Sequence, residues 1–184
     1  MTATEMPANV ALLRDFVNTL DVEERTDQLT TTSGLREWLV DRGLIDLSDP
    51  VGGEDLPTAL ALREGLRSHL AAHHDGTPGA PGPVLDAVAG RLPLRVRFVG
   101  PTPELAPAQD GVAGALATLL VAVAASVADG SWERLKICRS ETCAWAFYDV
   151  SKNRSRTWCA MGVCGNRAKT RAYRARQRPT PARS

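Results

Sequence analysis

Cysteine spacing is the feature that most constrains how this chain can fold. The 184-residue sequence has four cysteines, and they form two C-x4-C pairs with fifteen residues between the pairs: Cys138, Cys143, Cys159 and Cys164. Two short-spaced pairs separated by one hairpin's length can bring four thiolates to one tetrahedral Zn²⁺. The pattern therefore predicts one structural zinc, because four thiolates leave no open position for a catalytic water. The alternative is a pair of reversible disulfides or an oxidation sensor that releases zinc.

Charge is divided unequally along the chain. Residues 1–133 contain nine arginines, no lysine and 19 acidic residues, a net charge of −10, whereas residues 134–184 contain 13 basic and two acidic residues, a net charge of +11. Such asymmetry predicts two parts with different partners. We expect an acidic domain at 1–133, a zinc finger with a basic helix at 134–178 and a flexible tail at 179–184.

The acidic part is expected to be mostly helical. Apolar residues recur at helical spacing over several segments, and turn or capping residues flank them. The predicted helices are Asn9–Leu20, Gly34–Asp41 capped by Ser33, a long helix that Asp55 caps, Val84–Arg91, and Val112–Ala128 capped by Asp110. The last of these is short and interrupted for a membrane span, so we interpret it as a buried core helix.

One strand is predicted in the acidic part. Leu94–Val99 alternates apolar and basic residues, which is typical of a half-buried strand. Its partner is either Trp132–Ile137 or the segment between the cysteine pairs, and Pro78–Pro83 reads as a mobile loop. The expected fold class is therefore α+β: a mostly helical N-terminal domain with a small strand component, followed by a small four-cysteine finger.

The finger has too few apolar residues to fold without a bound metal or another cross-link. A structural metal would supply the missing folding free energy, on the order of 10 kcal/mol or more for small zinc peptides. Between the cysteine pairs we expect a hairpin, with Trp145–Tyr148 as one strand, Asp149–Ser155 as the turn and Arg156–Trp158 as the returning strand.

A basic helix is predicted directly after the last cysteine. Asn166 can cap it and Pro179 can end it. Arg167, Arg171, Arg174 and Arg178 follow at i, i+4, i+7 and i+11 on one face, and Lys169 and Arg176 flank that face. Such a helix can neutralise phosphates, while Asn166 or Arg167 at its start could reach base edges. The alternative is a solvated face or a disordered tail.

The cysteine pattern continues into Cys164-Gly165-Asn166-Arg167, and this run resembles the CGNR zinc finger, which is named for these four residues. Phe147-Tyr148-Asp149 and Ser155-Arg156 are also similar to that family. Upstream, Asp15–Thr19, Leu35–Leu39 and Leu62–Glu64 resemble the ABATE domain, which precedes this finger in many bacterial proteins. The resemblance implies a stress-responsive bacterial transcriptional regulator with a helical N-terminal domain and a DNA-binding finger.

In such a regulator the acidic domain would bind an effector or dimerise. We place a possible small-molecule pocket near Asn18, Thr19 and Arg63, because these polar residues lie beside apolar helical stripes in the matching segments. The alternative is that Asn18 and Arg63 only cap and pair helices. A single small finger offers little contact area, which favours a homodimer.

Other function classes fit the sequence less well. No nucleophile motif, phosphate loop or paired-carboxylate motif stands out, so we expect no enzyme. The N-terminus lacks a signal-peptide pattern, and we expect a cytoplasmic protein. Two alternatives to DNA binding stay open. One is an RNA-binding module, in which aromatic residues of the finger stack on bases. The other is a protein-interaction adaptor, in which the acidic domain binds the basic segment.

Overall fold

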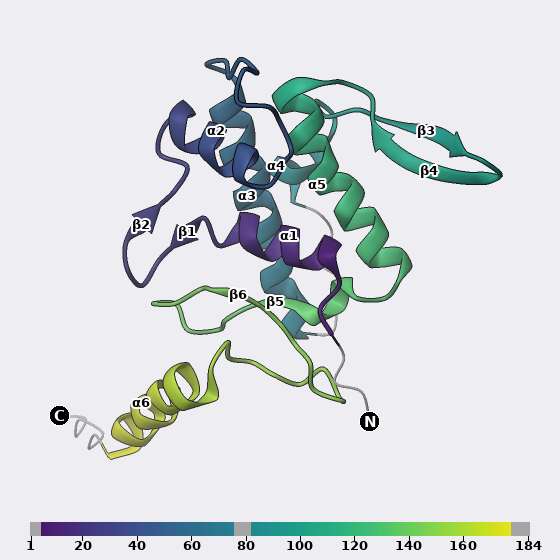
Figure 1. The fold of residues 1–184 in the computed structure, drawn as a ribbon. Coiled ribbons are helices and arrows are strands. Elements are labelled where there is room, and N and C mark those ends of the chain that lie inside the picture. The colour runs from purple at the N-terminus through teal and green to yellow at the C-terminus, as the bar shows by residue number, and fades with distance from the viewer. Residues whose placement is uncertain (1–4, 76–81, 178–184) are drawn as a thin grey trace.

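The computed structural model describes residues 5–75 and 82–177, which form a helical body, three two-stranded antiparallel hairpins and a C-terminal helix (Figure 1). This is the α+β class that the sequence predicts. The elements run in the order α1 (Ala8–Val17), β1 (Leu20–Asp21), β2 (Thr26–Asp27), α2 (Thr32–Asp41), α3 (Asp55–Ala71), α4 (Pro83–Ala89), β3 (Leu94–Val99), β4 (Thr102–Pro107), α5 (Gly111–Ala128), β5 (Leu135–Ile137), β6 (Ala146–Tyr148) and α6 (Asn166–Gln177).

The core lies where α1, α3 and α5 pack against one another. The apolar stripe predicted for the first helix is confirmed, since Val10, Leu13, Phe16 and Val17 are all fully buried. That helix ends at Val17 rather than continuing to Leu20, which begins β1. The backbone turns there because the amide of Thr19 bonds the carbonyl of Phe16, and the chain then enters the β1–β2 hairpin.

Helix α5 occupies the centre of this core, as its composition predicts. By length and composition alone it could cross a membrane. Its inward residues, among them Leu116 and Leu119, are instead buried against the other helices. A side chain at Gly114 would place a Cβ 2.2 Å from the carbonyl oxygen of Gln109, so glycine allows the preceding chain to pass close to the helix.

Two predicted helix starts are shifted by local hydrogen bonding. Thr31, not Ser33, caps α2, because its hydroxyl accepts the amide of Gly34 at 3.1 Å. The N-cap position of α3 belongs to Glu54, while the Asp55 carboxylate accepts the amide of Gly52 at 2.6 Å. Thr31 thus takes the capping role predicted for Ser33, and the Asp55 carboxylate bonds an amide before the helix instead of capping it.

The strand at Leu94–Val99 forms, but both expectations about its surroundings were wrong. It pairs with β4, the next segment of the chain, through a tight turn, and not with either segment proposed from the sequence. It is also exposed rather than half-buried, and Phe98 is 73% accessible. The hairpin projects from the helical body (Figure 1), so alternating residues do not gain a buried face.

The hairpin predicted between the cysteine pairs was also wrong. Strand β6 pairs with β5, which precedes the first cysteine, in the register Leu135 to Tyr148 and Ile137 to Ala146. Residues 156–158 form no strand, although the Thr157 carbonyl accepts the Arg139 amide at 3.2 Å. The β5–β6 sheet belongs to the main core, because Leu135, Ile137, Ala146 and Tyr148 pack in the same cluster as α1 and α3.

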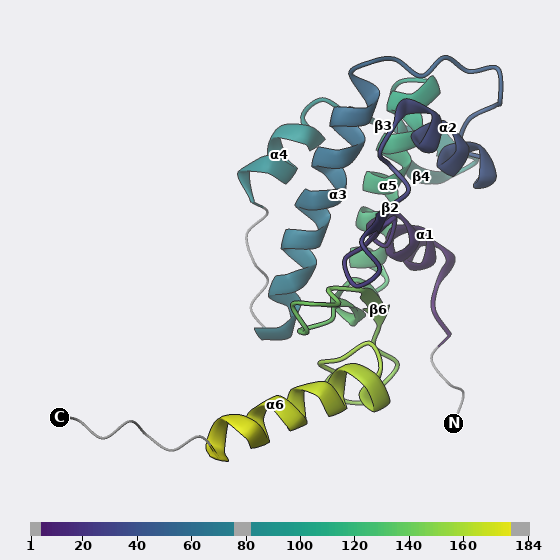
Figure 2. The ribbon, with the colours of Figure 1, turned by 90° about the vertical axis from the view of Figure 1, so that its left-hand side faces the viewer.

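Helix α6 lies at one end of the molecule. The β5–β6 sheet stands between α6 and the helical body in both views (Figures 1 and 2). The predicted stop at Pro179 and most of the predicted loop at 78–83 lie outside the described residues. From that loop the structure describes Gly82, the N-cap of α4, and Pro83, which begins that helix.

Candidate metal centre and nucleic-acid interface

The four cysteines meet in one cluster. One follows β5, one precedes β6, one lies in the loop beyond β6 and one precedes α6; they are Cys138, Cys143, Cys159 and Cys164. All four Sγ atoms lie within 4.8 Å of one another. Two of the separations are 3.6 Å, between Cys143 and Cys159, and 3.7 Å, between Cys159 and Cys164.

These separations fit a zinc ion. Four sulfurs at about 2.3 Å from one tetrahedral Zn²⁺ stand about 3.8 Å apart, close to these two separations, whereas a disulfide would bring two sulfurs to about 2.05 Å. All four cysteines are free thiols. The donor set is thus the one expected for a single structural zinc, which would be held by the four Sγ atoms and would join the two loops that carry the cysteine pairs.

Backbone hydrogen bonds shape the first pair of ligands. The amides of Cys143 and Ala144 both bond the carbonyl of Ser140, at 2.8 and 2.9 Å, and Ala144 takes a left-handed conformation with a φ of 49°. The Cys138 amide bonds the Trp145 carbonyl at 2.8 Å, which closes the loop onto β6. Burial raises the pKa of the Cys143 thiol to about 11, so metal binding must displace a proton from it.

Gly165 sets the path of the chain between the last ligand and α6. It is buried in a π-helical turn, Met161–Gly165, and a Cβ at this position would lie 2.5 Å from the sulfur of Met161 and 3.2 Å from the Trp158 ring. Any larger residue would push these side chains apart. The close approach gives a physical reason for glycine directly before the basic helix.

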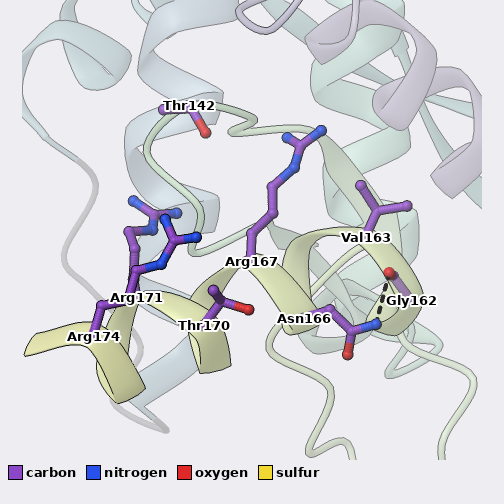
Figure 3. A pocket seen from close by; sticks show the side chains of 8 residues that line it. All are labelled: Thr142, Gly162, Val163, Asn166, Arg167, Thr170, Arg171 and Arg174. Atoms are coloured by element: carbon purple, nitrogen blue, oxygen red, sulfur yellow. Dashed lines mark hydrogen bonds between the residues drawn. The ribbon is translucent and has the colours of Figure 1, made fainter. Parts of the chain in front are cut away.

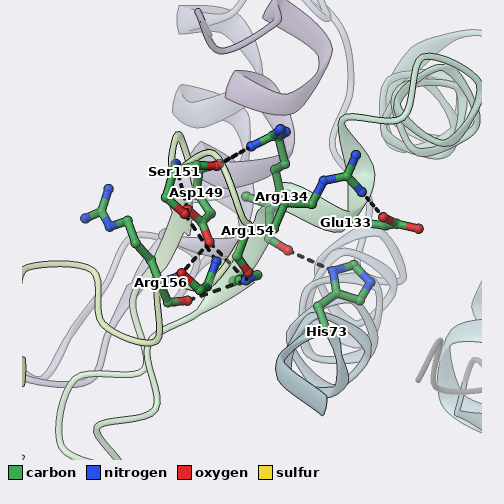
Figure 4. A network of polar contacts seen from close by, with 10 residues as sticks. His73, Glu133, Arg134, Asp149, Ser151, Arg154 and Arg156 are labelled. Carbon is green, nitrogen blue, oxygen red and sulfur yellow. Dashed lines mark hydrogen bonds and ion pairs between the residues drawn. The ribbon is translucent and has the colours of Figure 1, made fainter. Parts of the chain in front are cut away.

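A buried ion pair holds the long loop of the finger. Lys136 on β5 donates to the Asp149 carboxylate at 3.0 Å and to the carbonyls of Arg154 and Arg156. Figure 4 shows Asp149, Ser151, Arg154 and Arg156 close together in this network. Asp149 is fully buried and also accepts the Ser151 hydroxyl at 2.6 Å and the Arg156 amide at 2.8 Å. Burial alone would raise the pKa of Asp149, but these hydrogen bonds outweigh it and hold the pKa below its ordinary value.

Most aromatic residues of the finger serve as its packing. Phe147, Trp145 and Trp158 pack on the cysteine cluster, and Tyr148 faces the main core. The Arg156 guanidinium lies over the Phe147 ring at 5.3 Å. Tyr173 on α6 is 59% exposed. The rings that sequence reasoning offered for stacking on bases are therefore largely occupied, apart from Tyr173.

Helix α6 presents the predicted cations to solvent. It contains no acidic residue, and its basic residues are exposed: Arg167, Lys169, Arg171, Arg174 and Arg176. Arg178 lies outside the described residues. Asn166 begins the helix, but its side-chain amide donates to the Gly162 carbonyl at 3.0 Å, so it ties the helix to the preceding turn instead of capping amides as predicted.

A groove of about 570 Å³ runs along this helix. Figure 3 shows Arg171 and Arg174 side by side on the side facing Thr142, with Arg167 extended apart from them. The groove is lined by three arginines, two threonines and small neighbours: Arg167, Arg171, Arg174, Thr142, Thr170, Asn166, Gly162 and Val163. Cations and hydroxyls that line one groove are suited to phosphate oxygens. Sequence reasoning missed the two threonines, since Thr142 reaches the groove only through the fold of the cysteine loop.

Comparison with protein families decides the identity of both parts. A model of the ABATE family, described as "Putative stress-induced transcription regulator", matches residues 11–130, and a model of the CGNR zinc finger matches residues 134–177. The chain belongs to the ABATE family. A search of curated proteins finds no match for it. The architecture suspected from the motifs is confirmed, and the protein is a member of a regulator family with a CGNR zinc finger.

The predicted effector residues of the ABATE domain are engaged within the chain. Arg63 is 3% exposed and makes a two-pronged ion pair with Asp27, at 2.6 and 2.9 Å, and its guanidinium also donates to the Thr19 hydroxyl at 3.1 Å. The pKa of Arg63 is raised, because its bonds to Asp27 and Glu64 outweigh the effect of burial. Arg63 thus joins α3 to β2 and to the residue Thr19 beyond α1, not to another helix, and a ligand pocket at these residues stays a prediction.

Asn18 joins the ABATE domain to the CGNR finger. Its side-chain amide donates to the carbonyl of Ala146 at 3.0 Å and accepts the amide of the same residue at 2.8 Å, so it pairs with β6 as a neighbouring strand would. Arg67 adds a second link by donating to the carbonyls of Val17 and Ala144, at 3.1 and 3.2 Å. These hydrogen bonds therefore fix the finger to the ABATE domain, and the two are not joined by a linker alone.

A further contact joins the two parts at the basic helix. Arg167, the arginine of the CGNR motif, pairs with Glu23 in the β1–β2 turn at 2.6 Å. The hydrogen bond and charge of Glu23 raise the pKa of Arg167. The sequence carries no local signal for this pair, because 143 residues separate its members.

Proposed function

We propose that this protein is a zinc-dependent, DNA-binding transcriptional regulator that contacts duplex DNA through α6 of its CGNR finger. The observation that carries the proposal is the groove along α6, which is lined by three arginines (Arg167, Arg171 and Arg174) and two threonines. Three guanidinium groups on one exposed face can neutralise consecutive phosphates and release counterions. Membership in a regulator family supports the same conclusion.

Different arginines of α6 would have different roles in DNA binding. Arg171 and Arg174, in the middle of the helix, contact phosphates and supply affinity. Arg167 lies at the start of the helix, where a recognition helix commonly reaches base edges in the major groove. Zinc acts through the backbone, since it joins the loops that hold the N-terminal end of α6.

We favour duplex DNA over single-stranded RNA as the ligand because few aromatic side chains of the finger are exposed. Stacking on unpaired bases requires exposed aromatic side chains, whereas Trp145, Phe147 and Trp158 pack on the cysteine cluster. Tyr173 is exposed, and one ring offers little stacking surface. An RNA-binding module therefore remains the alternative that the selection experiment must test.

We also propose how the protein is regulated and where in the cell it acts. The ABATE domain would respond to stress or to a small-molecule effector, and two copies would pair so that two fingers read one site. We place the protein in the cytoplasm, where thiols stay reduced and available to zinc. No catalytic role is proposed.

The first test is sequence selection from a random duplex pool by the zinc-loaded full-length protein, with single-stranded RNA as competitor. We expect enrichment of a defined motif, and an inverted repeat would support a dimer. Cys159→Ser is the control, because it removes a zinc ligand and should abolish enrichment. If zinc is intact and nothing is enriched, DNA recognition by this protein is refuted; retained binding to the RNA would favour the RNA-binding alternative.

A second test measures the phosphate contacts. Replacing Arg171 with Gln should weaken binding to all duplexes alike and reduce the slope of log affinity against log salt by about 0.9. Arg91→Gln is the matched control, since Arg91 is also exposed but belongs to the acidic domain. Equal slopes for the two variants would show that the groove is not the binding surface.

A further inference from the structure

The β1–β2 turn of the ABATE domain reaches the start of the basic helix. The Glu23 carboxylate lies 2.6 Å from the guanidinium of Arg167, and both side chains are partly exposed, at 34% and 47%. Arg167 also lines the groove proposed to receive phosphates. The same guanidinium thus faces an acidic group of its own chain and a candidate site for an external anion.

The turn that carries Glu23 is held at both ends. The Asp21 carboxylate accepts the amides of Glu23 and Glu24, each at 2.9 Å, which shapes the turn directly before the ion pair. At the other end, Asp27 is anchored by the buried guanidinium of Arg63. The carboxylate of Glu23 is therefore presented from a defined backbone position.

The finger is held against the same body. Asn18 pairs with the backbone of Ala146, and Arg67 bonds the carbonyl of Ala144, next to a zinc ligand. Glu23 thus lies on a turn that Asp27 anchors to α3, and Arg167 begins a helix that the cysteine cluster joins to the loop held by Arg67. The Glu23–Arg167 contact therefore follows from how the ABATE domain and the finger pack together.

We propose that Glu23 is an intramolecular competitor of nucleic-acid phosphate for Arg167, so that the β1–β2 turn restrains binding by the finger. A carboxylate and a phosphate accept hydrogen bonds from a guanidinium in the same way, and Arg167 cannot serve both fully. The inference rests on the proposed function, because it assumes that the groove binds nucleic acid. It assigns the ABATE domain a direct effect on the finger, which any signal that moves the turn could relieve.

The restraint should be modest and dependent on salt. The pair is partly exposed, and exposed ion pairs contribute little because water and salt screen them. Removal of the competing carboxylate should therefore raise duplex affinity about two- to five-fold near physiological salt. The gain should shrink as salt rises.

The experiment compares Glu23→Gln with Glu24→Gln in full-length, zinc-loaded protein. Both substitutions remove one negative charge from the same turn, and Glu24 is exposed with no ion pair among the described residues. Binding to a labelled mixed-sequence duplex is followed by fluorescence anisotropy over a salt series, and zinc content and thermal unfolding confirm that each variant is folded. We expect E23Q to bind more tightly than wild type and E24Q to bind like wild type.

A double-mutant cycle with Arg167→Gln separates competition from general charge effects. If Glu23 acts through Arg167, the gain from E23Q disappears in the R167Q background. A gain that persists there, equal gains in E23Q and E24Q, or no gain in E23Q would each overturn the competition while leaving duplex binding by wild type intact. If neither wild type nor E23Q binds duplex or single strand, the proposed function fails and the competition fails with it.

Discussion

At the scale of single residues, the structure depends on side chains that bond the backbone of distant segments. The Asn18 side chain donates one hydrogen bond to the backbone of Ala146 and accepts another from it. The Lys136 ammonium group donates hydrogen bonds to Asp149 and to two carbonyls of the finger loop. The side chains of Asn18, Lys136 and Asp149 are buried, so the loss of any one of them would leave a buried partner without its hydrogen bond. Such positions are sensitive to substitution although they bind no ligand in our proposal.

Asn18→Ala should destabilise the protein by about 2–4 kcal/mol, because the amide and the carbonyl of Ala146 would both lose their partner. The free energy of unfolding, measured with urea and zinc present, checks this. Asn153→Ala is the control, since Asn153 is exposed in the finger loop, and it should change stability by no more than about 0.5 kcal/mol. Equal effects of the two variants would show that the Asn18 pairing is not formed in solution.

Asp149→Asn should destabilise the protein by about 3–5 kcal/mol at neutral pH, because Lys136 would remain buried without its counter-charge. The wild-type pKa of Asp149 is lowered on folding, so the charged carboxylate stabilises the fold above its unfolded pKa and that contribution is lost as the pH falls through the folded value. The difference between wild type and D149N should therefore shrink below about pH 4. A difference that stays constant down to acid pH would contradict the ion pair; urea unfolding across a pH series measures it.

At the scale of elements, the finger consists of two parts with different sources of stability. The β5–β6 sheet packs with α1 and α3 in the main core, whereas the cysteine loops and the start of α6 have a small cluster built on the four thiols. Apolar burial supports the first part. We expect the second part to depend on the zinc that its sulfur geometry fits, since its own apolar cluster is small.

Removal of zinc with a chelator should therefore selectively unfold the loops that carry the four cysteines, together with α6. Hydrogen exchange should show lost protection in the cysteine loops and in α6, while amides of β5 and β6 and of the helical body stay protected. The Cys159→Ser variant should give the same pattern without a chelator. Loss of β5–β6 protection together with the loops would mean that zinc, not the core, holds the sheet.

At the scale of the whole molecule, the two family matches share one hydrophobic core. The ABATE match ends at residue 130 and the CGNR match begins at residue 134. Leu135, Ile137, Ala146 and Tyr148 nevertheless pack in the cluster formed by α1, α3 and α5. The first strands of the finger thus complete the body of the domain before it, and the site on α6 is positioned by that body.

A fragment of residues 1–133 should therefore fail to unfold cooperatively, whereas residues 1–149 should retain a cooperative transition. Each large apolar side chain removed from the core takes away about 1.5–3 kcal/mol, and the total stability of a domain is about 5–15 kcal/mol. Thermal unfolding followed by circular dichroism compares the two fragments. A stable 1–133 fragment would show that the body does not need the sheet.

Local residue patterns were sufficient to predict part of this structure. The cysteine spacing predicts the four thiols of the cluster, and apolar periodicity predicts α1 and α5, because metal geometry and helix formation depend on residues close together in the chain. Gly43, just beyond α2, has a φ of 63°, a conformation that glycine commonly adopts after a helix. Predictions of strand partners failed, since local alternation does not specify which segment lies alongside.

Only the tertiary structure decided the long-range pairings. Asn18 meets Ala146, β5 meets β6 across the first cysteine pair, and Glu23 meets Arg167 because the packing of α1, α3 and α5 brings these segments together. A side chain's partner depends on the burial and direction that the whole core imposes, and spacing along the chain does not carry that information. For the same reason, the motifs predicted the parts of the finger, whereas the core determined where its basic helix lies.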